Sequence, residues 1–415
     1  ANSEPPNRAE LRLVVNAGSI LEDEDQLGLA HFVEHMAFNG TRNFERQEII
    51  SYLESLGMRF GPDINAYTSF DETVYMLTVP TDSAGVLERG IAILEDWAWG
   101  ITFDSLQVEQ ERGVVIEEWR LGQGAASRIQ QQQFPTLAHR SRYADRMPIG
   151  TYESLTTFDH AALRRFYEDW YRPDLLAVVA VGDFDPDEVE ELIRRHFEHI
   201  PPHPNPRERR EYTVPSHPET LISIVSDPEL TTATVSLYLK RPPDVWRTEA
   251  DYREWIAQSL ASAMLINRLG EISQRVDSPF LDVSSYQGRF VRTLSTFGLN
   301  VRTSDEDIAR AVQVLLQEVE RAARFGFART ELEREKREML RVMEQRYAQR
   351  GRVSSGSYAA DYVSYFLYGG SIRGTALEYQ LYRELIPRIG LRETNRAVAE
   401  WTSAGNRVLL VAAPD

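Results

Sequence analysis

Two histidines and a glutamate near the N-terminus carry the clearest chemical signal in this sequence. His31 and His35 lie in residues 27–38, whose apolar spacing predicts a helix. Residues i and i+4 of a helix share one face about 6 Å apart, so both imidazoles can reach a single metal ion. Glu34 lies beside His35, where its carboxylate can take a proton from a water molecule near that ion. The segment therefore predicts a zinc site with a general base.

A catalytic zinc ion needs a third protein ligand and an open position for water. The chain contains no cysteine, so this ligand has to come from a carboxylate. Residues 105–121 predict a helix in which Glu111 and Glu118, seven residues apart, share one face. Two turns separate them by about 10 Å along the axis, so one would bind the ion while the other orients a ligand. The nearby Glu109 and Glu117 are expected to be solvated.

The composition is that of a globular protein with more than one core. The 415 residues suit two domains, and 42% hydrophobic with 26% charged residues is typical of packed proteins. A formal charge of -17 argues against the basic face that nucleic acids need. The lack of cysteine excludes disulfides, thiolate metal sites and cysteine nucleophiles. No apolar run approaches the ~20 residues of a membrane-spanning helix.

The first half of the chain alternates strands and helices, and the second half repeats this plan. The Pro-rich linker at 200–206 places the boundary near residue 207, which predicts domains 1–206 and 207–415. The last segment, 407–415, echoes the apolar run 175–183, as expected for two copies of one α+β unit. Strands are predicted at 10–16, 65–78, 175–183, 220–225 and 233–239, and helices at 46–56, 84–99, 185–196, 249–274, 305–323 and onward through 350.

Four ordered motifs resemble the pitrilysin/insulinase family of zinc metallopeptidases, nearest its processing-peptidase-like and bacterial zinc-protease branches. They are residues 28–41 with the inverted His-x-x-Glu-His pattern, the strand 65–68, the run 111–118, and Pro148-Ile-Gly-Thr151. The resemblance covers most of residues 1–200, while the second half is similar only in its general plan. It implies two similar domains, each a mostly antiparallel sheet packed with helices, which together form one half of a clam-shell peptidase.

Carried over residue by residue, the resemblance assigns His31, His35 and Glu118 as the ligands of one Zn²⁺ ion. It makes Glu34 the general base and Glu111 a carboxylate behind the ligands. Glu111 remains the rival for the third ligand.

The resemblance further implies that an extended peptide binds along a sheet edge at Asn65, Ala66, Tyr67 and Thr68. The domain 207–415 is expected to be noncatalytic. In the family the far half contributes an Arg and a Tyr to substrate binding, and residues 208–415 contain no convincing pair of this kind. We therefore expect a second two-domain half as partner, either on a longer precursor or as a separate subunit. By analogy, we expect a soluble protein of the bacterial periplasm, or one otherwise exported.

The predicted function is a zinc-dependent endopeptidase that hydrolyses peptides or unfolded segments with metal-activated water and Glu34 as the base. The alternatives are a noncatalytic scaffold and a peptide-binding subunit with a structural zinc. The intact motif favours the enzyme, because noncatalytic relatives commonly lose a ligand or the base. Structural zinc sites are also usually closed by four protein ligands.

Overall fold

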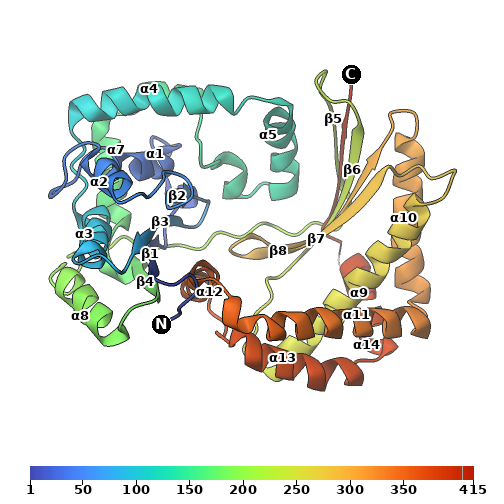
Figure 1. The fold of residues 1–415 in the computed structure, drawn as a ribbon. Coiled ribbons are helices and arrows are strands. Elements are labelled where there is room, and N and C mark those ends of the chain that lie inside the picture. The colour runs from blue at the N-terminus through green and yellow to red at the C-terminus, as the bar shows by residue number, and fades with distance from the viewer. Residues whose placement is uncertain (404) are drawn as a thin grey trace. The chain divides into compact units, whose positions relative to one another are not determined.

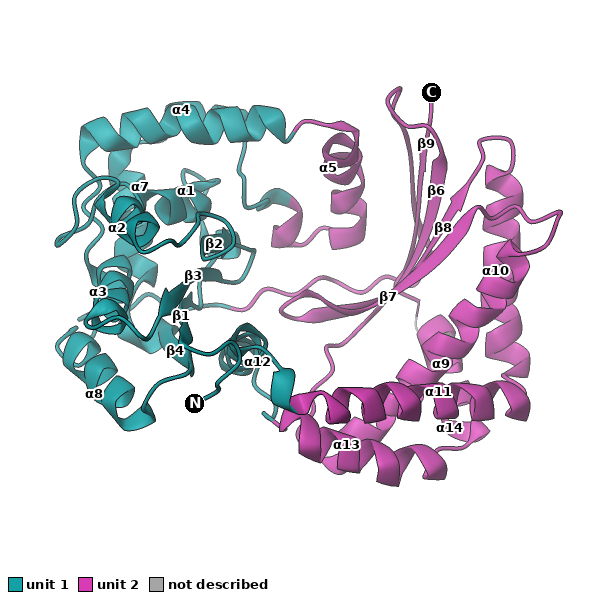
Figure 2. Cartoon of the chain, viewed as in Figure 1, with its two compact units in different colours: residues 1–122, 145–210, 351–372 teal, residues 123–144, 211–350, 373–415 magenta. Residues whose placement is uncertain are grey.

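The computed structural model describes residues 1–403 and 405–415. The chain forms two compact units (Figure 2), and each of them is discontinuous in the sequence. Unit 1 comprises Ala1–Gly122, Asp145–Arg210 and Gly351–Ile372, and unit 2 comprises Gln123–Ala144, Glu211–Arg350 and Arg373–Asp415.

Unit 1 is built on a four-stranded sheet in the order β2-β3-β1-β4, in which all neighbours are antiparallel. The strands are β1 (Arg8–Val15), β2 (Ile64–Thr68), β3 (Thr73–Pro80) and β4 (Leu176–Gly182). The helices are α1 (Leu29–Met36), α2 (Glu48–Ser55), α3 (Val86–Trp99), α4 (Ser105–Leu121), α6 (Tyr152–Thr157), α7 (His160–Trp170), α8 (Pro186–Phe197) and α12 (Ser355–Tyr368) (Figure 1).

Both faces of this sheet are covered. Leu11 of β1 lies against Gly90 of α3, where an added Cβ would come within 2.8 Å of the leucine side chain. On the opposite face, Val14 and Val74 form a cluster with Val363 and Leu367 of α12. A strand that is buried on both faces needs apolar residues at successive positions, which accounts for the run at the end of β1.

Unit 2 repeats this topology. Its five-stranded sheet has the order β5-β9-β6-β8-β7, with strands β5 (Leu221–Ser226), β6 (Ala233–Arg241), β7 (Asp282–Val291), β8 (Leu294–Thr303) and β9 (Arg407–Ala413). Its helices are α5 (Ala125–Ala138), α9 (Glu249–Ser273), α10 (Ile308–Phe325), α11 (Arg329–Ala348), α13 (Gly374–Leu385) and α14 (Leu391–Ser403). Strands β6, β7, β8 and β9 pair as β1, β2, β3 and β4 do, and β5 adds a parallel strand beside β9. The predicted α+β class with mostly antiparallel sheets is confirmed.

Helices α5 and α12 are exchanged between the two units. Each packs on the sheet of one unit, while the helix that precedes it in the sequence belongs to the other unit. Helix α5 follows α4 in sequence, yet Leu137 of α5 packs on Val408 and Leu410 in unit 2. Arg128 of α5 also forms a bidentate pair with Asp227, with both bonds at 2.7 Å. Reciprocally, α12 follows α11 but packs in unit 1. The compact units therefore differ from the two predicted domains, 1–206 and 207–415, which are consecutive in the sequence. That the two domains are homologous copies stays a prediction.

The predicted strand 65–78 is wrong as a single element, because it forms the hairpin of β2 and β3. The turn is closed by the backbone N–H of Ser69, which donates to the carbonyl of Glu72 at 2.8 Å. Sequence periodicity continues through so tight a turn, so it did not reveal the reversal. Among the described residues, no helix is both long and apolar enough to cross a membrane.

Lys240 of β6 is a buried cation with an unusual consequence for stability. Its side chain is 4% exposed, its Nζ donates to the carbonyl of Leu137 at 3.2 Å, and burial lowers its pKa to about 8. An unfolded lysine has a pKa of about 10.4, so between these values the unfolded chain binds more protons and stability rises with pH. Below pH 8 the buried charge costs stability.

We therefore expect Lys240→Met to raise the free energy of unfolding at pH 7 by about 1–3 kcal/mol. This gain should shrink as the pH rises from 8 to 10, as measured by denaturant unfolding at several pH values. The control is Lys336→Met, because Lys336 is also buried but pairs with Glu333 at 3.2 Å. An equal gain in both variants, or one independent of pH, would contradict the explanation.

Candidate metal centre

Helix α1 holds the two histidines of the inverted motif on one side. The rings of His31 and His35 lie edge to face with their centroids 4.7 Å apart. The start of the helix is fixed by buried Glu22, whose carboxylate accepts hydrogen bonds from the backbone N–H groups of Gly28 at 3.0 Å and Ala30 at 2.8 Å. A carboxylate at a helix N-terminus satisfies free N–H groups and stabilises the helix. The opposite side of α1 is buried through Leu29, Ala30, Phe32, Val33 and Met36.

The motif Pro148-Ile-Gly-Thr151 supports the same helix start. Gly28 and Gly150 have φ values of 89° and 73°, and their backbones pass close to each other. A Cβ on Gly28 would lie 2.9 Å from the Cα of Gly150, and a Cβ on Gly150 would lie 2.7 Å from the Cα of Gly28. Any other residue at either position would push α1 away from this segment.

Helix α4 brings a carboxylate to both imidazoles. Val108, Glu111 and Val115 form its buried stripe, and Glu118 continues that stripe into a half-exposed position. One oxygen of Glu118 lies 3.3 Å from Nε2 of His35, and the other lies 3.7 Å from Nε2 of His31. The three side chains can each offer one ligand atom within 4.8 Å of the other two. The three residues predicted to bind zinc are thus brought together.

Glu111 occupies the other side of the His35 ring. Its Oε1 lies 2.7 Å from Nδ1 of His35, which leaves Nε2 turned toward Glu118. Asn39 holds Glu111 in turn, because its Nδ2 donates to Oε2 of Glu111 at 2.7 Å and to the carbonyl of His35 at 3.1 Å. Metal-binding histidines commonly have such a carboxylate on the second nitrogen. Sequence reasoning missed Asn39, although its place four residues after His35 is a usable signal.

Glu34 is buried beside the histidine face of the same helix, close enough to His35 and Glu118 to interact with their charges. Its side chain is 8% exposed, and its Oε2 accepts a hydrogen bond from the hydroxyl of Thr68 at 2.6 Å. Burial raises the pKa of Glu34, while the Thr68 hydrogen bond opposes this shift. Thr68 is one of the four residues predicted to bind substrate, and its hydroxyl also contacts the predicted base.

The contact predicts that Thr68 positions Glu34. Thr68→Ala is expected to lower the rate of peptide hydrolysis by about 10- to 100-fold, because a hydrogen bond to a charged carboxylate is worth about 1.5–3 kcal/mol. Zinc content should not change. Thr68→Ser keeps the hydroxyl and serves as the control, so a loss of the same size in both variants would assign the effect to the methyl group.

The charges of the cluster favour a cation. Burial and the neighbouring His35 lower the pKa of His31 to about 4, so its ring is neutral at pH 7. Burial also lowers the pKa of His35, but hydrogen bonds with Glu111 and Glu118 outweigh it and raise that pKa to about 9. The hydrogen bond with His35 lowers the pKa of Glu118. With Glu118 ionised and His35 protonated, a metal ion bound here would take the place of the proton on His35.

The donor set fits a catalytic zinc ion. Two imidazole nitrogens and one carboxylate oxygen are a known ligand set for zinc, and three protein ligands leave a fourth position open. Among residues 1–403 and 405–415, no other group of three or more His, Asp or Glu side chains brings its ligand atoms so close together. The second histidine pair, His196 and His199, contacts Glu95 of α3 instead.

The strand predicted to bind peptide lies at an edge of the unit 1 sheet. Within the described residues, strand β2 pairs with β3 alone, through residues 64–68 and 73–77. Asn65 and Tyr67 are exposed on one face, while Ala66 and Thr68 are half-buried on the face toward α1. The four residues therefore present a free edge beside Glu34.

Comparison with known proteins assigns the family. The family model described as insulinase (peptidase family M16) matches residues 1–144, and the model described as peptidase M16 inactive domain matches residues 157–339. The chain belongs to the insulinase family. The resemblance inferred from the four sequence motifs is confirmed.

Named members of the insulinase family are similar to this chain at moderate identity. The zinc protease PQQL-like of Arabidopsis thaliana is 36% identical over 95% of this chain and 38% of its own length. The probable zinc protease PqqL of Escherichia coli K12 is 34% identical over 80% of this chain and 36% of its own length. The first half of the periplasmic protease PqqL from Escherichia coli has a TM-score of 0.92 and 28% identity, over 100% of this chain and 88% of that one.

The chain spans well under half the length of the full-length zinc proteases that it matches. Its family and fold are those of zinc proteases, and the relatives' names imply zinc.

Proposed function

We propose that this chain is the zinc-bearing half of an endopeptidase that hydrolyses peptides or unfolded segments. The observation that carries the proposal is the pair of supporting contacts around the metal cluster: Glu111 fixes Nδ1 of His35, and Thr68 fixes the carboxylate of Glu34. A purely structural zinc site needs no such base and is closed by a fourth protein ligand.

In this proposal His31, His35 and Glu118 hold one zinc ion. When bound, such an ion supplies Lewis acidity, which acidifies a water molecule and polarises a peptide carbonyl. Glu34 takes the proton from the attacking water and passes it to the leaving amine. Its burial and the hydrogen bond from Thr68 keep the carboxylate in one orientation for this transfer.

The edge of β2 supplies the substrate site. Backbone groups of Asn65, Ala66, Tyr67 and Thr68 bind an extended peptide as an added strand, and alternating side chains contact alternate substrate residues. The scissile bond of such a peptide then lies beside Glu34, since Thr68 belongs to strand β2 and its hydroxyl contacts the base. Because the strand is read mainly through its backbone, the site accepts many sequences but only extended ones.

A second two-domain half completes the enzyme, as a subunit or as the rest of a longer polypeptide. The length of the related zinc proteases supports this. Their relative in Escherichia coli is described as periplasmic, and we propose the periplasm or another exported location for this protein as well.

The test is zinc content and peptide hydrolysis for this chain, alone and together with the second half. We expect about one zinc per chain, hydrolysis only with the second half present, and loss of activity on chelation with recovery on adding zinc. Hydrolysis that persists after complete removal of zinc would refute the proposal. So would a fully zinc-loaded complete protein that cleaves no unfolded polypeptide, which would favour a noncatalytic peptide-binding subunit.

A further inference from the structure

A groove with exposed apolar side chains runs between strand β5 and helix α10 in unit 2. Its volume is about 640 Å³, and its apolar lining residues are Ile222, Leu237, Leu316, Val319, Phe325 and Leu409. The side chains of Ile222 and Phe325 are 58% and 81% exposed, and Ile224, next on the same face of β5, is 72% exposed. Large apolar side chains gathered in one groove mark a binding surface more often than chance exposure does.

The groove exists because the helical layer over this sheet stops short of its outermost strand. Leu237 of β6 and Leu409 of β9 belong to the core under the helices of unit 2. Successive residues of a strand face opposite sides, so Leu221 points to α5 while Ile222 and Ile224 point to the side of α10. In the described part of the chain no helix covers these two isoleucines.

In unit 1, a helix covers the surface that corresponds to this groove of unit 2. Helices α3 and α10 each follow the third strand of the repeated topology, and β4 and β9 are each its last strand. In unit 1, α8 comes directly after β4 and packs along α3. Arg195 of α8 contacts Glu88 at 3.2 Å, and His196 contacts Glu95 at 2.6 Å. A counterpart of α8 that follows β9 would pack along α10, on the groove.

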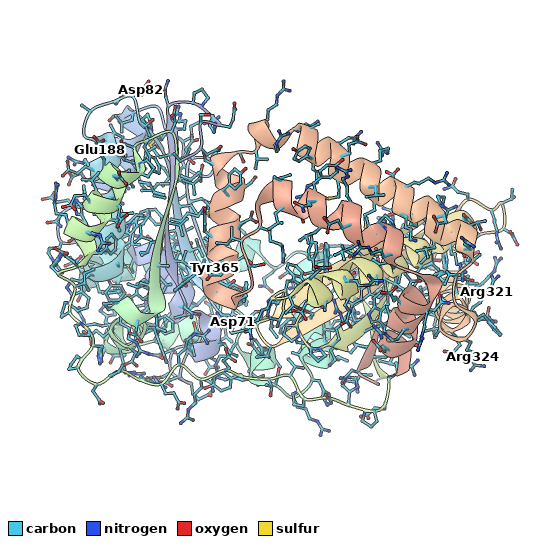
Figure 3. The ribbon with its side chains drawn as sticks, turned by 90° about the horizontal axis from the view of Figure 1, so that it is seen from below. Asp71, Asp82, Glu188, Arg321, Arg324 and Tyr365 are labelled. Atoms are coloured by element: carbon cyan, nitrogen blue, oxygen red, sulfur yellow. The ribbon has the colours of Figure 1, made fainter. Side chains whose placement is uncertain are left out.

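The charge of the groove indicates what such a helix carries. Its charged lining residues are Glu320, Arg321, Arg324 and Arg407, which give a net positive rim in a chain of charge -17. Arg321 and Arg324 are both more than half exposed at the end of α10 (Figure 3), where they pair with Glu318 and Glu320 respectively. The Nε of Arg407 is buried and makes no hydrogen bond within the described residues. Acidic side chains complement this rim.

We propose that the groove binds an amphipathic helix from the polypeptide that follows β9 in the longer form of the protein. The helix places apolar residues at i, i+3 and i+7 against Ile222, Leu316 and Phe325, and acidic residues beside Arg321 and Arg324. This inference rests on the proposed two-half enzyme, and it assigns unit 2 as the anchor for the connection to the second half. The similarity to the first half of a longer protease supports a following segment.

Single cysteines test the groove directly, because the chain has no cysteine of its own. Ile222→Cys reports on the groove, and Val276→Cys, at a fully exposed position of unit 2, is the control. Maleimide labelling rates are compared between residues 1–415 and the polypeptide extended by the residues encoded after Asp415. We expect the extension to slow labelling of Ile222→Cys by about tenfold or more, as for a groove open about a tenth of the time, and to leave Val276→Cys unchanged.

A charge reversal tests the acidic side chains of the helix. In the extended polypeptide, Arg321→Glu with Arg324→Glu is expected to restore most of the labelling of Ile222→Cys. Both arginines are on the surface, but Arg321 pairs with buried Glu318 and Arg324 pairs with Glu320. Amide hydrogen exchange of β5 in the unsubstituted protein therefore gives the same comparison without any substitution.

Equal labelling of Ile222→Cys in the two forms, or a gene that encodes nothing after Asp415, would overturn the proposal. Protection that appears in residues 1–415 alone and grows with protein concentration would overturn it in favour of a second copy. Unchanged protection in the arginine variant would overturn the acidic assignment. None of these readouts needs zinc or hydrolysis. An inactive protein with a protected groove would therefore contradict the proposed endopeptidase function and leave the groove proposal intact.

Discussion

Glu34→Gln is expected to lower the rate of peptide hydrolysis by about 10²–10⁴-fold, the usual contribution of a positioned general base. Glutamine has the same shape and can still accept the hydrogen bond that the Thr68 hydroxyl gives to Glu34. It cannot take a proton from water. The metal ligands are left in place, so zinc content should stay the same. The measurement is turnover of an unfolded polypeptide, together with zinc analysis of the same preparation.

Glu117→Gln provides the matched control for this experiment. Glu117 lies on α4 beside Glu118, but its side chain is exposed and pairs only loosely with Arg120, at 3.5 Å. The same chemical change at this position removes the same charge from the neighbourhood of the metal without removing the base. Hydrolysis should stay within about twofold of the parent, since exposed pairs contribute little. If Glu34→Gln kept full activity, the mechanism would be wrong, and if it lost zinc, Glu34 would be a ligand.

Glu118→Gln is expected to have the second large effect, on zinc affinity. Glu118 is the carboxylate that reaches both imidazoles, at 3.3 Å and 3.7 Å, so its loss leaves a site of two histidines. Glu111→Gln removes only the partner of Nδ1 of His35, at 2.7 Å. Substitutions of that kind usually weaken metal binding by about 10–100-fold. We therefore expect a greater loss of affinity in Glu118→Gln than in Glu111→Gln, measured by competition with a zinc-binding dye.

The order of the two losses decides between the two glutamates. A larger loss in Glu111→Gln would make Glu111 the third ligand and Glu118 the supporting carboxylate. Far-ultraviolet circular dichroism of each variant serves as the folding control, because Glu111 is buried and also accepts a hydrogen bond from Asn39. Asn39→Ala gives an independent check, since it disturbs Glu111 without touching a proposed ligand.

The local elements around the site could be predicted from the sequence because each has a strong short-range signal. The predicted helix 105–121 has the same first and last residues as α4. At its N-terminus, the side chain of Asp104 caps the first turn by accepting hydrogen bonds from the N–H groups of Leu106 and Gln107. The predicted helix 27–38 contains α1, whose apolar residues face the core at helical spacing. The hairpin of β2 and β3 was missed, although Ser69 and Asp71 in its turn are residues that favour turns over strands.

The pairing of helices with sheets could not be predicted, since it depends on contacts between residues far apart in the chain. Nothing in the local sequence of α5 indicates that Arg128 pairs with Asp227, or that α12 returns to the sheet of unit 1. An apolar helix face is satisfied equally well by any apolar sheet face within reach. Only the three-dimensional packing shows which one it meets.

The metal centre, too, could be predicted from the sequence only in part. The sequence by itself determined that His31 and His35 share a helix face and that Glu34 lies next to them, because the geometry of one helix decides this. It left Glu111 and Glu118 as rivals, since both lie on one stripe of a distant helix. Only the tertiary structure decided that Glu118 faces both imidazoles while Glu111 and Asn39 hold His35 from behind. That choice depends on how α1 packs against α4, and local spacing carries no record of it.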